Sequence, residues 1–291
     1  MEPAETAQSD LITPESFVLV FRDWRRKWLL RPKDTPKLHT HLGILDVAAL
    51  VGTEYGTVVT TTLGDELTIL RPTIEDVIMK LSRRTQVIYP KDLGLMMVKL
   101  GVHAGSRVVE TGTGSGATTA LLAYLVRPGG HVYTYELRPE FQEVAKKNVE
   151  RAGLADSVTF TSGDSRLGFG LKGMDAGVLD VGDPWDVVES MKDSLKPSAP
   201  MAAVTPTTNQ AERLVSKMKD EGFAAVETVE ILLRNLEARP GMTRPSNRMV
   251  AHTAYLTFGR TAAKRARPVE IEQYPPVEDT SEESVPDPGL T

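Results

Sequence analysis

Residues 107–116 read Arg-Val-Val-Glu-Thr-Gly-Thr-Gly-Ser-Gly, and this stretch decides the fold. Two β-branched residues lead to the acidic Glu110. Glycine then occupies every second position: Gly112, Gly114 and Gly116. A helical pattern follows at once over residues 117–125. Since glycine is needed where a backbone turns with positive φ or approaches a ligand closely, the stretch predicts a strand, a tight turn and a helix start. The unpaired N–H groups of that helix start suit a polar or anionic ligand.

The spacing of the glycines separates two classes of nucleotide-binding turn. A dinucleotide-binding turn reads G-x-G-x-x-G, with a pyrophosphate on the helix end. Here the third glycine comes one residue earlier, and an acid precedes the loop. This variant resembles the first motif of class I methyltransferases, which bind S-adenosyl-L-methionine (SAM) and release S-adenosyl-L-homocysteine. The resemblance implies cofactor contacts from Glu110, Gly112, Gly114, Ser115, Gly116, Ala117 and Thr118.

Two further acids follow the ends of later strand-like runs. Residues 132–136 end in Glu136, whose carboxylate at a strand end can accept hydrogen bonds from both ribose hydroxyls of an adenosine. Residues 158–161 lead to Asp164, where methyltransferases usually carry an acid that meets the adenine. Each acid alone also fits a simpler role, as a solvated strand-end acid or a turn residue in Gly-Asp-Ser. The ordered series of glycine turn and two strand-end acids favours a SAM site.

Composition excludes several classes of protein. The chain has 291 residues, of which 41% are hydrophobic and 25% charged, as is ordinary for a soluble globular protein. The absence of cysteine excludes disulfide scaffolds and thiolate metal sites, and it fits a reducing cytoplasm. Because the five histidines are scattered, we expect no metal. No apolar run has a membrane-spanning length, and residues 1–10 are too acidic and polar for a signal peptide.

The net charge of −5 is unevenly distributed. Residues 269–291 hold seven acids and no Lys or Arg, so the rest of the chain carries +2. This tail also contains four prolines, and its composition predicts disorder. A mildly basic body with an acidic tail is compatible with a nucleic-acid substrate, provided that local patches supply the phosphate contacts.

Four segments are expected along the chain: a flexible N-terminus (1–14), a small β-barrel-like domain (15–80), a methyltransferase domain (81–265) and an acidic disordered tail (266–291). The second segment contains two hairpin patterns, 16–21 with 27–31 and 57–62 with 66–70. Short strands and turns at this spacing suggest a barrel-like module. A helix over 73–81 follows, with Thr73 as a candidate N-cap.

Strand and helix patterns alternate in the third segment. Strands are expected over 107–110, 131–136, 158–162, 176–181 and 200–205, and helices over 93–100, 116–126, 139–153, 184–195 and 209–221. Such alternation predicts an α/β fold with a parallel sheet. The last strand-like runs, 224–233 and 253–258, have no helix between them and should pair antiparallel. That combination is typical of the Rossmann-like methyltransferase sheet.

Four other stretches point to the methyl acceptor. They are Lys37-Leu38-His39-Thr40-His41-Leu42-Gly43, Arg84-Thr85-Gln86-Val87-Ile88-Tyr89-Pro90-Lys91-Asp92, Leu179-Asp180-Val181-Gly182-Asp183-Pro184-Trp185, and Arg244-Pro245 with His252-Thr253-Ala254-Tyr255-Leu256. Together, in this order, they resemble the tRNA adenine-58 N1-methyltransferases of bacteria and archaea, over roughly residues 15–260. The resemblance implies a tRNA substrate, a small N-terminal β domain, a class I catalytic domain and a homotetramer.

Asp180 is the candidate catalytic residue. Adenine N1 has a lone pair that can attack the SAM methyl group, and methylation leaves positive charge spread toward N6. An acid beside N6 and N1 would orient the base and stabilise that charge. Asp180 stands at the end of the strand beside the glycine turn, where open α/β sheets bind ligands. The family's catalytic acid falls on Asp180, which would also border the cofactor. The alternative is a strand-end acid paired with a nearby Lys or Arg.

Asp183 is the rival acid in the same stretch. It immediately precedes Pro184, and proline favours the first position of a helix. Aspartate is a preferred N-cap. The sequence therefore favours a capping role for Asp183 and leaves Asp180 for catalysis.

Five residues are candidates for substrate binding, each with a simpler alternative. Tyr89 could stack on the target base or be a core-edge tyrosine. Lys91 could touch phosphate or be a solvated lysine. Trp185 could be a pocket wall or part of the core. Arg244 and Arg248 could contact phosphate from a Pro/Gly-containing loop or be solvated. A basic hairpin cluster likewise suits RNA backbone binding or an exposed rim: Arg22, Arg25, Arg26, Lys27, Arg31 and Lys33, with Trp24 and Trp28.

Three rival functions share some of these features. A class I methyltransferase with another acceptor, such as a protein carboxylate, would share the glycine turn but would not need the N-terminal β module or the 180–185 stretch. A non-catalytic RNA-binding partner subunit would lose the turn and its acids, which are all present here. A nicotinamide-dependent dehydrogenase is disfavoured by the glycine spacing and by the terminal strand pair.

Overall fold

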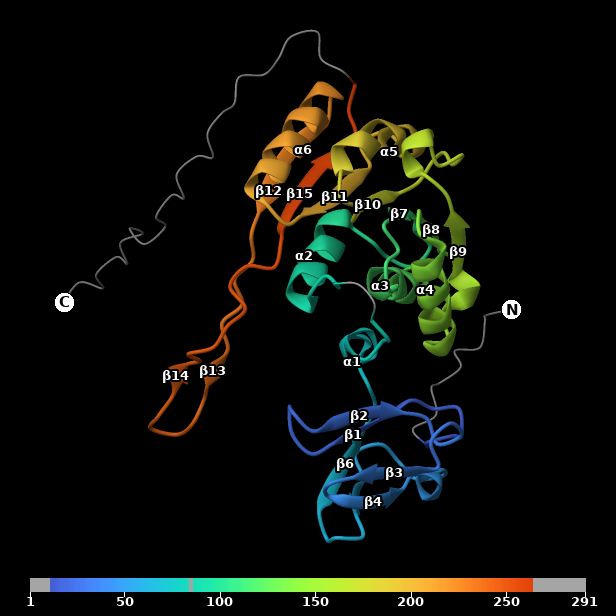
Figure 1. The fold of residues 1–291 in the computed structure, drawn as a ribbon, viewed down its shortest axis with the longest axis vertical. Coiled ribbons are helices and arrows are strands. Elements are labelled where there is room, and N and C mark those ends of the chain that lie inside the picture. Colours follow the sequence, from blue (N-terminus) through green and yellow to red (C-terminus); the bar gives the residue numbers. More distant parts are fainter. Residues whose placement is uncertain (1–10, 84–85, 264–291) are drawn as a thin grey trace, which may run out of the picture.

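The fold has two β-containing bodies and a long hairpin arm (Figure 1). The structure is a computed structural model, which describes residues 11–83 and 86–263. The predictions for residues 1–10, for Arg84 and Thr85, and for the acidic tail 266–291 fall outside the described residues.

The N-terminal body is β-rich, as expected. One antiparallel sheet has the order β2-β1-β6-β5, formed by β1 (Val18–Phe21), β2 (Lys27–Leu30), β5 (Val58–Thr60) and β6 (Glu66–Leu70). Both expected hairpins are therefore confirmed. A separate hairpin pairs β3 (Lys37–Thr40) with β4 (Gly43–Asp46), followed by a 3-10 turn η1 (Ala48–Leu50). Alternating inward-facing residues from both sheets, such as Val18 and Ile69 of the first and Leu45 of the second, form one apolar core.

Helix α1 (Ile74–Met79) joins the two bodies. Thr73 caps it as expected, because its hydroxyl accepts from Asp76 N–H while the Asp76 carboxylate accepts from Thr73 N–H. Ile78 is buried in the core of the second body, so the packing of α1 belongs to that body. An ion pair of 2.9 Å between Lys27 Nζ and Asp76 Oδ1 ties β2 to α1. A domain boundary at residue 80 stays a prediction, and this packing favours one nearer residue 73.

The second body contains a seven-stranded sheet in the order β12-β15-β11-β10-β7-β8-β9. Its strands are β7 (Arg107–Thr111), β8 (His131–Glu136), β9 (Val158–Ser162), β10 (Ala176–Leu179), β11 (Pro200–Thr205), β12 (Ala224–Val229) and β15 (Tyr255–Arg260). Strand β15 runs antiparallel between β11 and β12, whereas the pairings from β11 to β9 are parallel. The predicted fold class, a mostly parallel sheet with an antiparallel terminal pair after a small β-rich domain, is confirmed.

Helices cover both faces of this sheet (Figure 1). Residues of α2 (Pro90–Leu100), α3 (Ala117–Val126) and α4 (Pro139–Arg151) pack into one apolar core. Residues of α5 (Val188–Ser194) and α6 (Thr208–Asp220) pack into a second core. Three short 3-10 turns are η2 (Ala155–Ser157), η3 (Ser165–Leu167) and η4 (Pro184–Val187). The helix expected over 184–195 thus begins as a 3-10 turn and becomes α-helical only at Val188.

Residues 230–253 form the arm, which projects away from the sheet between β12 and β15 (Figure 1). The strand expected over 224–233 ends already at Val229. The sequence predicted a loop around residues 240–248, but the structure contains a short hairpin of β13 (Leu236–Glu237) and β14 (Arg244–Pro245). Two-residue strands leave no alternating pattern that sequence reasoning could detect. The arm exposes large apolar side chains: Leu232, Leu233, Leu236, Met242, Met249 and Val250.

Over residues 11–83 and 86–263, none of the helices combines the length and the hydropathy needed to cross a lipid bilayer.

Candidate functional site

A cavity of about 760 Å³ lies where the parallel strands end. Its walls come from the residues that directly follow five neighbouring strands, as expected for a ligand site in an open α/β sheet. Six of the residues predicted from the sequence to form the site line it: Tyr89, Gly112, Gly114, Glu136, Asp164 and Asp180. The fold therefore brings the glycine turn, both strand-end acids and the candidate catalytic acid into one space.

Gly112 is required by the close contact between two of these walls. Its φ is +91°, and a Cβ added to it would lie 1.8 Å from the carbonyl oxygen of Asp180. Gly114 and Gly116 also have positive φ, of 53° and 80°. The turn can adopt this shape only with glycine, so the alternating spacing follows from its geometry.

Glu136 braces the turn from the end of β8. Its side chain is only 4% exposed, and its Oε2 accepts a hydrogen bond of 2.9 Å from Gly114 N–H. Its Oε1 accepts one of 3.1 Å from Arg138 N–H. Arg138 Nε donates a second, longer hydrogen bond of 3.4 Å to Oε1, so the acceptor capacity that remains for ribose hydroxyls is mainly that of Oε2.

Glu110 lies buried behind the turn and does not line the cavity. Thr119 Oγ1 donates a hydrogen bond of 2.6 Å to its Oε2. Burial raises the pKa of Glu110 to about 7, and the negative charges of Asp180 and Glu136 add to the effect. Ser115, Gly116, Ala117 and Thr118 also lie outside the lining. Cofactor contact by these five residues stays a prediction, and the geometry favours a supporting role for Glu110.

Asn148 of α4 holds the glycine turn in place. Its side-chain amide donates to Ser115 O and Ser82 O, both at 2.8 Å, and its Oδ1 accepts from Ser82 N–H at 3.1 Å. We expect Asn148→Ala to lower the free energy of unfolding by about 2–4 kcal/mol, because it removes three hydrogen bonds between α4 and the segments at Ser82 and Ser115, one of which is buried. Denaturant unfolding would measure this loss. Replacement of its exposed neighbour, Lys147→Ala, should change stability by less than about 0.5 kcal/mol, and equal effects of the two variants would contradict the expectation.

Asp180 sits half-buried in the cavity, directly after β10. Its N–H donates to Thr111 O at 2.9 Å, which fixes its backbone beside the turn. Burial raises the pKa of its carboxyl to about 6, and the charge of Glu136 contributes in the same direction. Among the described residues, no Lys or Arg forms an ion pair with Asp180. The described residues therefore do not support the simpler interpretation, in which Asp180 is a strand-end acid paired with a Lys or Arg.

The expected capping role of Asp183 is wrong. Asp183 occupies the N-cap position of η4, but its side chain accepts no capping hydrogen bond. The cause is local geometry, since the chain after Pro184 forms a 3-10 turn rather than the first turn of an α-helix. Asp183 instead lines the cavity together with Asp180.

Asp164 lies at the cavity in an ion pair with Arg166. The guanidinium group contacts both carboxylate oxygens, with Nη2 at 2.6 Å from Oδ2 and Nε at 2.9 Å from Oδ1. The hydrogen bond from the Arg166 side chain is the main reason that the pKa of Asp164 is lowered. Contact between Asp164 and an adenine stays a prediction.

The five substrate-binding candidates are dispersed. Tyr89 lines the cavity at the N-cap of α2 and is 38% exposed. The side chain of Lys91 is buried, and its ammonium group already donates to three protein acceptors. This geometry therefore disfavours a contact between Lys91 and phosphate. Trp185 is a buried residue outside the cavity, with the Arg213 guanidinium 4.1 Å from its ring centroid. Arg244, paired with Glu237, and Arg248 lie on the arm. Their roles in substrate binding stay predictions.

The basic hairpin cluster is largely neutralised by nearby acids. Four of its members form ion pairs: Arg22 with Asp65, Arg26 with Asp23, Lys27 with Asp76, and Lys33 with Glu15. The exposed-rim interpretation is therefore favoured over a dedicated RNA patch, since paired charges contribute less field to a polyanion.

Sequence reasoning did not single out several residues that line the cavity: Asp92, Arg138, Ser165, Arg166, Pro206 and Thr253. Asp92 and Thr253 lie within stretches that carry the family resemblance, but nothing in their spacing marks them individually. Among the described residues, no group of three His, Cys, Asp or Glu side chains could hold a metal ion.

Comparison with known proteins identifies the family to which this site belongs. A family profile described as the tRNA methyltransferase complex GCD14 subunit matches residues 67–242, which include the glycine turn and the four acids Glu110, Glu136, Asp164 and Asp180. The chain belongs to this family.

Curated relatives in this family cover most of the chain. A protein of Methanocaldococcus jannaschii named tRNA (adenine(57)-N(1)/adenine(58)-N(1))-methyltransferase TrmI is 34% identical, over 82% of this chain and 93% of the relative. A Thermus thermophilus protein named tRNA (adenine(58)-N(1))-methyltransferase TrmI is also 34% identical, over 79% of this chain and 91% of the relative.

Two solved structures of similar sequence share the fold. A protein described as a SAM-dependent O-methyltransferase from Thermotoga maritima has a TM-score of 0.83 and 38% identity, over 89% of this chain and 97% of that one. The tRNA (m1A58) methyltransferase TrmI from Aquifex aeolicus has a TM-score of 0.75 and 33% identity, over 87% and 99%. Both matches extend across the N-terminal body as well as the methyltransferase domain, because neither domain alone spans so much of the chain.

Proposed function

We propose that the protein transfers a methyl group from SAM to N1 of an adenine in the T-loop of tRNA, at position 58 alone or at 57 as well. Its relatives of 34% identity are named for this reaction. The observation that carries the proposal is the placement of Asp180, without a Lys or Arg partner among the described residues, beside the glycine turn in a cavity of about 760 Å³.

The residues at the turn fit SAM. Gly112 has no side chain where a Cβ would collide with the opposite wall, and the Glu136 carboxylate retains acceptor capacity toward the cavity. The turn residues would hold the adenosine and methionine parts, with Glu136 accepting from the ribose hydroxyls. When bound, SAM supplies an electrophilic methyl group on a positively charged sulfur.

Asp180 acts on the acceptor base. As a carboxylate it accepts a hydrogen bond from the adenine N6 amino group, which holds N1 in line with the methyl group. As the N1 lone pair forms the new C–N bond, positive charge grows on the ring and spreads toward N6. A fixed negative charge beside N6 stabilises that charge in the transition state more than in the ground state. Tyr89, which also lines the cavity, would stack on the base.

The target base must leave its position in folded tRNA to reach this cavity. A T-loop adenine engaged in tertiary pairing does not expose its N1, so the base has to be extruded into the protein. The half-buried position of Asp180 supports this step, because a base would have to enter the cavity to reach its carboxylate.

A homotetramer in the cytoplasm completes the proposal. Six large apolar side chains of the arm are between 44% and 65% exposed on the isolated chain. Apolar surface of this extent on one element supports burial against another copy of the chain. Size-exclusion chromatography with light scattering would test the stoichiometry.

Activity should depend on pH through Asp180. The carboxylate is the active form, and burial raises its pKa to about 6, so protonation below that pH removes the acceptor for N6. We expect kcat/KM for tRNA to fall about tenfold per pH unit as the pH drops below this pKa, because kcat/KM reports groups of the free enzyme. Initial rates between pH 5 and 8 would measure this fall in kcat/KM. A kcat/KM that stays constant down to pH 5 would contradict the role of the Asp180 carboxylate.

The function itself is tested by incubating purified protein with an unmodified tRNA transcript and methyl-labelled SAM. The RNA is then digested, and the labelled nucleoside and its position are identified. The expected product is 1-methyladenosine at position 58. Label in another nucleoside, or label in an oxygen-methylated small molecule but not in tRNA, would leave the SAM-binding fold intact and overturn the acceptor.

A further inference from the structure

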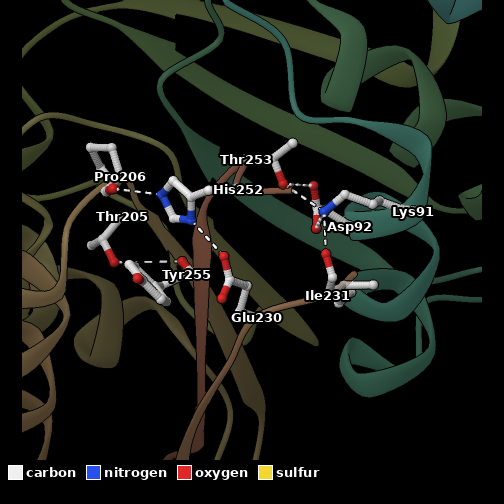
Figure 2. A network of polar contacts seen from close by, with 9 residues as sticks. All are labelled: Lys91, Asp92, Thr205, Pro206, Glu230, Ile231, His252, Thr253 and Tyr255. Atoms are coloured by element: carbon white, nitrogen blue, oxygen red, sulfur yellow. Dashed lines mark hydrogen bonds and ion pairs between the residues drawn. The ribbon is translucent and has the colours of Figure 1, made fainter. Parts of the chain in front are cut away.

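The base of the arm is fastened to the cavity at two points (Figure 2). The arm leaves the sheet at Glu230 and Ile231 and returns at His252 and Thr253. Both the outgoing and the returning chain make polar contacts with residues on, or next to, the cavity wall. A movement of the arm would therefore displace residues of the cavity wall, and the reverse also holds.

The first fastening is a closed ring of three side chains. Lys91 Nζ donates to Asp92 Oδ1 at 2.7 Å and to Thr253 Oγ1 at 2.6 Å. Thr253 Oγ1 in turn donates to Asp92 Oδ2 at 2.8 Å. The third ammonium proton of Lys91 goes to Ile231 O at 2.7 Å, so one lysine binds both chains of the arm. The side chains of Lys91 and Asp92 are 7% and 1% exposed, and Asp92 and Thr253 line the cavity.

The second fastening is His252, whose ring lies between two groups that only accept hydrogen bonds. Its Nδ1 is 2.6 Å from Glu230 Oε1, and its Nε2 is 2.9 Å from Pro206 O. A neutral imidazole carries one N–H and can satisfy only one of them, whereas an imidazolium satisfies both. Pro206 directly follows β11 and lines the cavity. The protonated ring therefore ties both ends of the arm to the cavity wall.

We propose that His252 is a positioning residue for the reaction: as an imidazolium bridging Glu230 and the Pro206 carbonyl, it holds the base of the arm and the acceptor side of the cavity in the geometry that accepts tRNA. The inference rests on the function proposed above. It concerns the acceptor side alone, because His252 contacts none of the residues of the glycine turn.

The bridge has a defined pH dependence. The titratable groups that act on the ring are Glu230 directly after β12, Tyr255 from β15, whose ring centroid lies 4.8 Å away, and Lys91 from α2, through its charge. The hydrogen bond to Glu230 is the main cause that raises the pKa of His252, and Lys91 opposes it. The imidazolium, and with it the bridge, is present below the raised pKa and lost as pH rises through it.

The experiment compares wild type, His252→Asn and Glu230→Gln in steady-state methylation of a tRNA transcript between pH 6.5 and 9. In Glu230→Gln the amide can donate to Nδ1, so a neutral ring retains both bonds. We expect the wild-type KM for tRNA to rise about 3- to 10-fold across this range as a charge-assisted bond is lost. His252→Asn should show the high KM throughout, and Glu230→Gln should show a low, level KM. SAM affinity by calorimetry should be equal in all three.

Glu212→Gln, the same substitution at an exposed site on α6, is the matched control and should keep the wild-type pH dependence. A wild-type KM in His252→Asn, or the wild-type pH dependence in Glu230→Gln, would overturn the positioning role while leaving the proposed function intact. A fall in SAM affinity in His252→Asn would also overturn it, by indicating a general loss of structure. Failure of the wild type to methylate tRNA, despite binding SAM, would instead overturn the proposed function and the inference with it.

Discussion

Replacing Asp180 with asparagine is expected to lower kcat for tRNA methylation by about 10²–10⁴-fold, with little change in SAM affinity. Asparagine keeps the shape of the side chain, but its amide carries no negative charge to offset the charge that develops on the adenine ring. Its NH₂ group can also face the N6 amino group, and two hydrogen-bond donors then oppose each other where an acceptor is needed. The loss should therefore fall on kcat more than on KM.

Two measurements separate this loss from a folding defect. Calorimetric titration with SAM should give the wild-type affinity within a few-fold, since Asp180 touches the turn through its backbone, which the substitution retains. Asp186→Asn is the matched control, because Asp186 is an exposed acid in the same stretch that does not line the cavity. It should retain nearly full activity. A variant Asp180→Asn with more than a tenth of wild-type kcat would remove Asp180 from the proposed mechanism.

Gly112→Ala is expected to abolish SAM binding at accessible concentrations and to lower the melting temperature. The added Cβ would lie 1.8 Å from Asp180 O and 2.6 Å from its carbonyl carbon, and both are backbone atoms that cannot rotate away. The turn must therefore separate from β10, which breaks the wall of the cavity. Overpacking of this kind costs about 1–3 kcal/mol or more, in addition to about 1–2 kcal/mol for a left-handed backbone at a residue with a side chain.

Gly105→Ala is the control that isolates the clash from the backbone strain. Gly105 has nearly the same φ, +89° against +91°, but no atom lies within 4 Å of an added Cβ. It should lose only the strain contribution of about 1–2 kcal/mol and bind SAM as the wild type does. Differential scanning calorimetry and SAM titration of both variants would measure the contrast. Equal SAM affinities in the two variants would show that the close approach at Gly112 is unimportant.

Local sequence patterns determined the elements of this fold and their order. Strands β8, β9 and β11 begin and end at the residues expected. The first two are short β-branched and aromatic runs, and β11 is a short apolar run with proline at its start and directly after its end. Thr73 caps α1 because the capping box needs only two residues three positions apart. The glycine turn is equally local, since positive φ at alternate positions demands glycine.

Residue identity and strand order together were enough to place the acids in one site. Parallel strands present their carboxyl ends at the same edge, so acids that follow β8, β9 and β10 must gather there. Asp180, Glu136 and Asp164 accordingly line one cavity. No long-range contact had to be known to infer this grouping.

Tertiary structure alone decided the roles of Lys91 and Trp185, because each role depends on what a distant segment brings to the side chain. Two of the three acceptors of Lys91 come from residues 231 and 253, which lie 140 and 162 positions along the chain, and the guanidinium of Arg213 in α6 lies over the ring of Trp185. Asp183 lost its expected cap for a local reason, because the chain after it forms a 3-10 turn. Hydrophobic periodicity and capping rules report only neighbours within a few residues, so they determined the framework, whereas contacts between segments far apart in the sequence determined which polar groups remain free for chemistry.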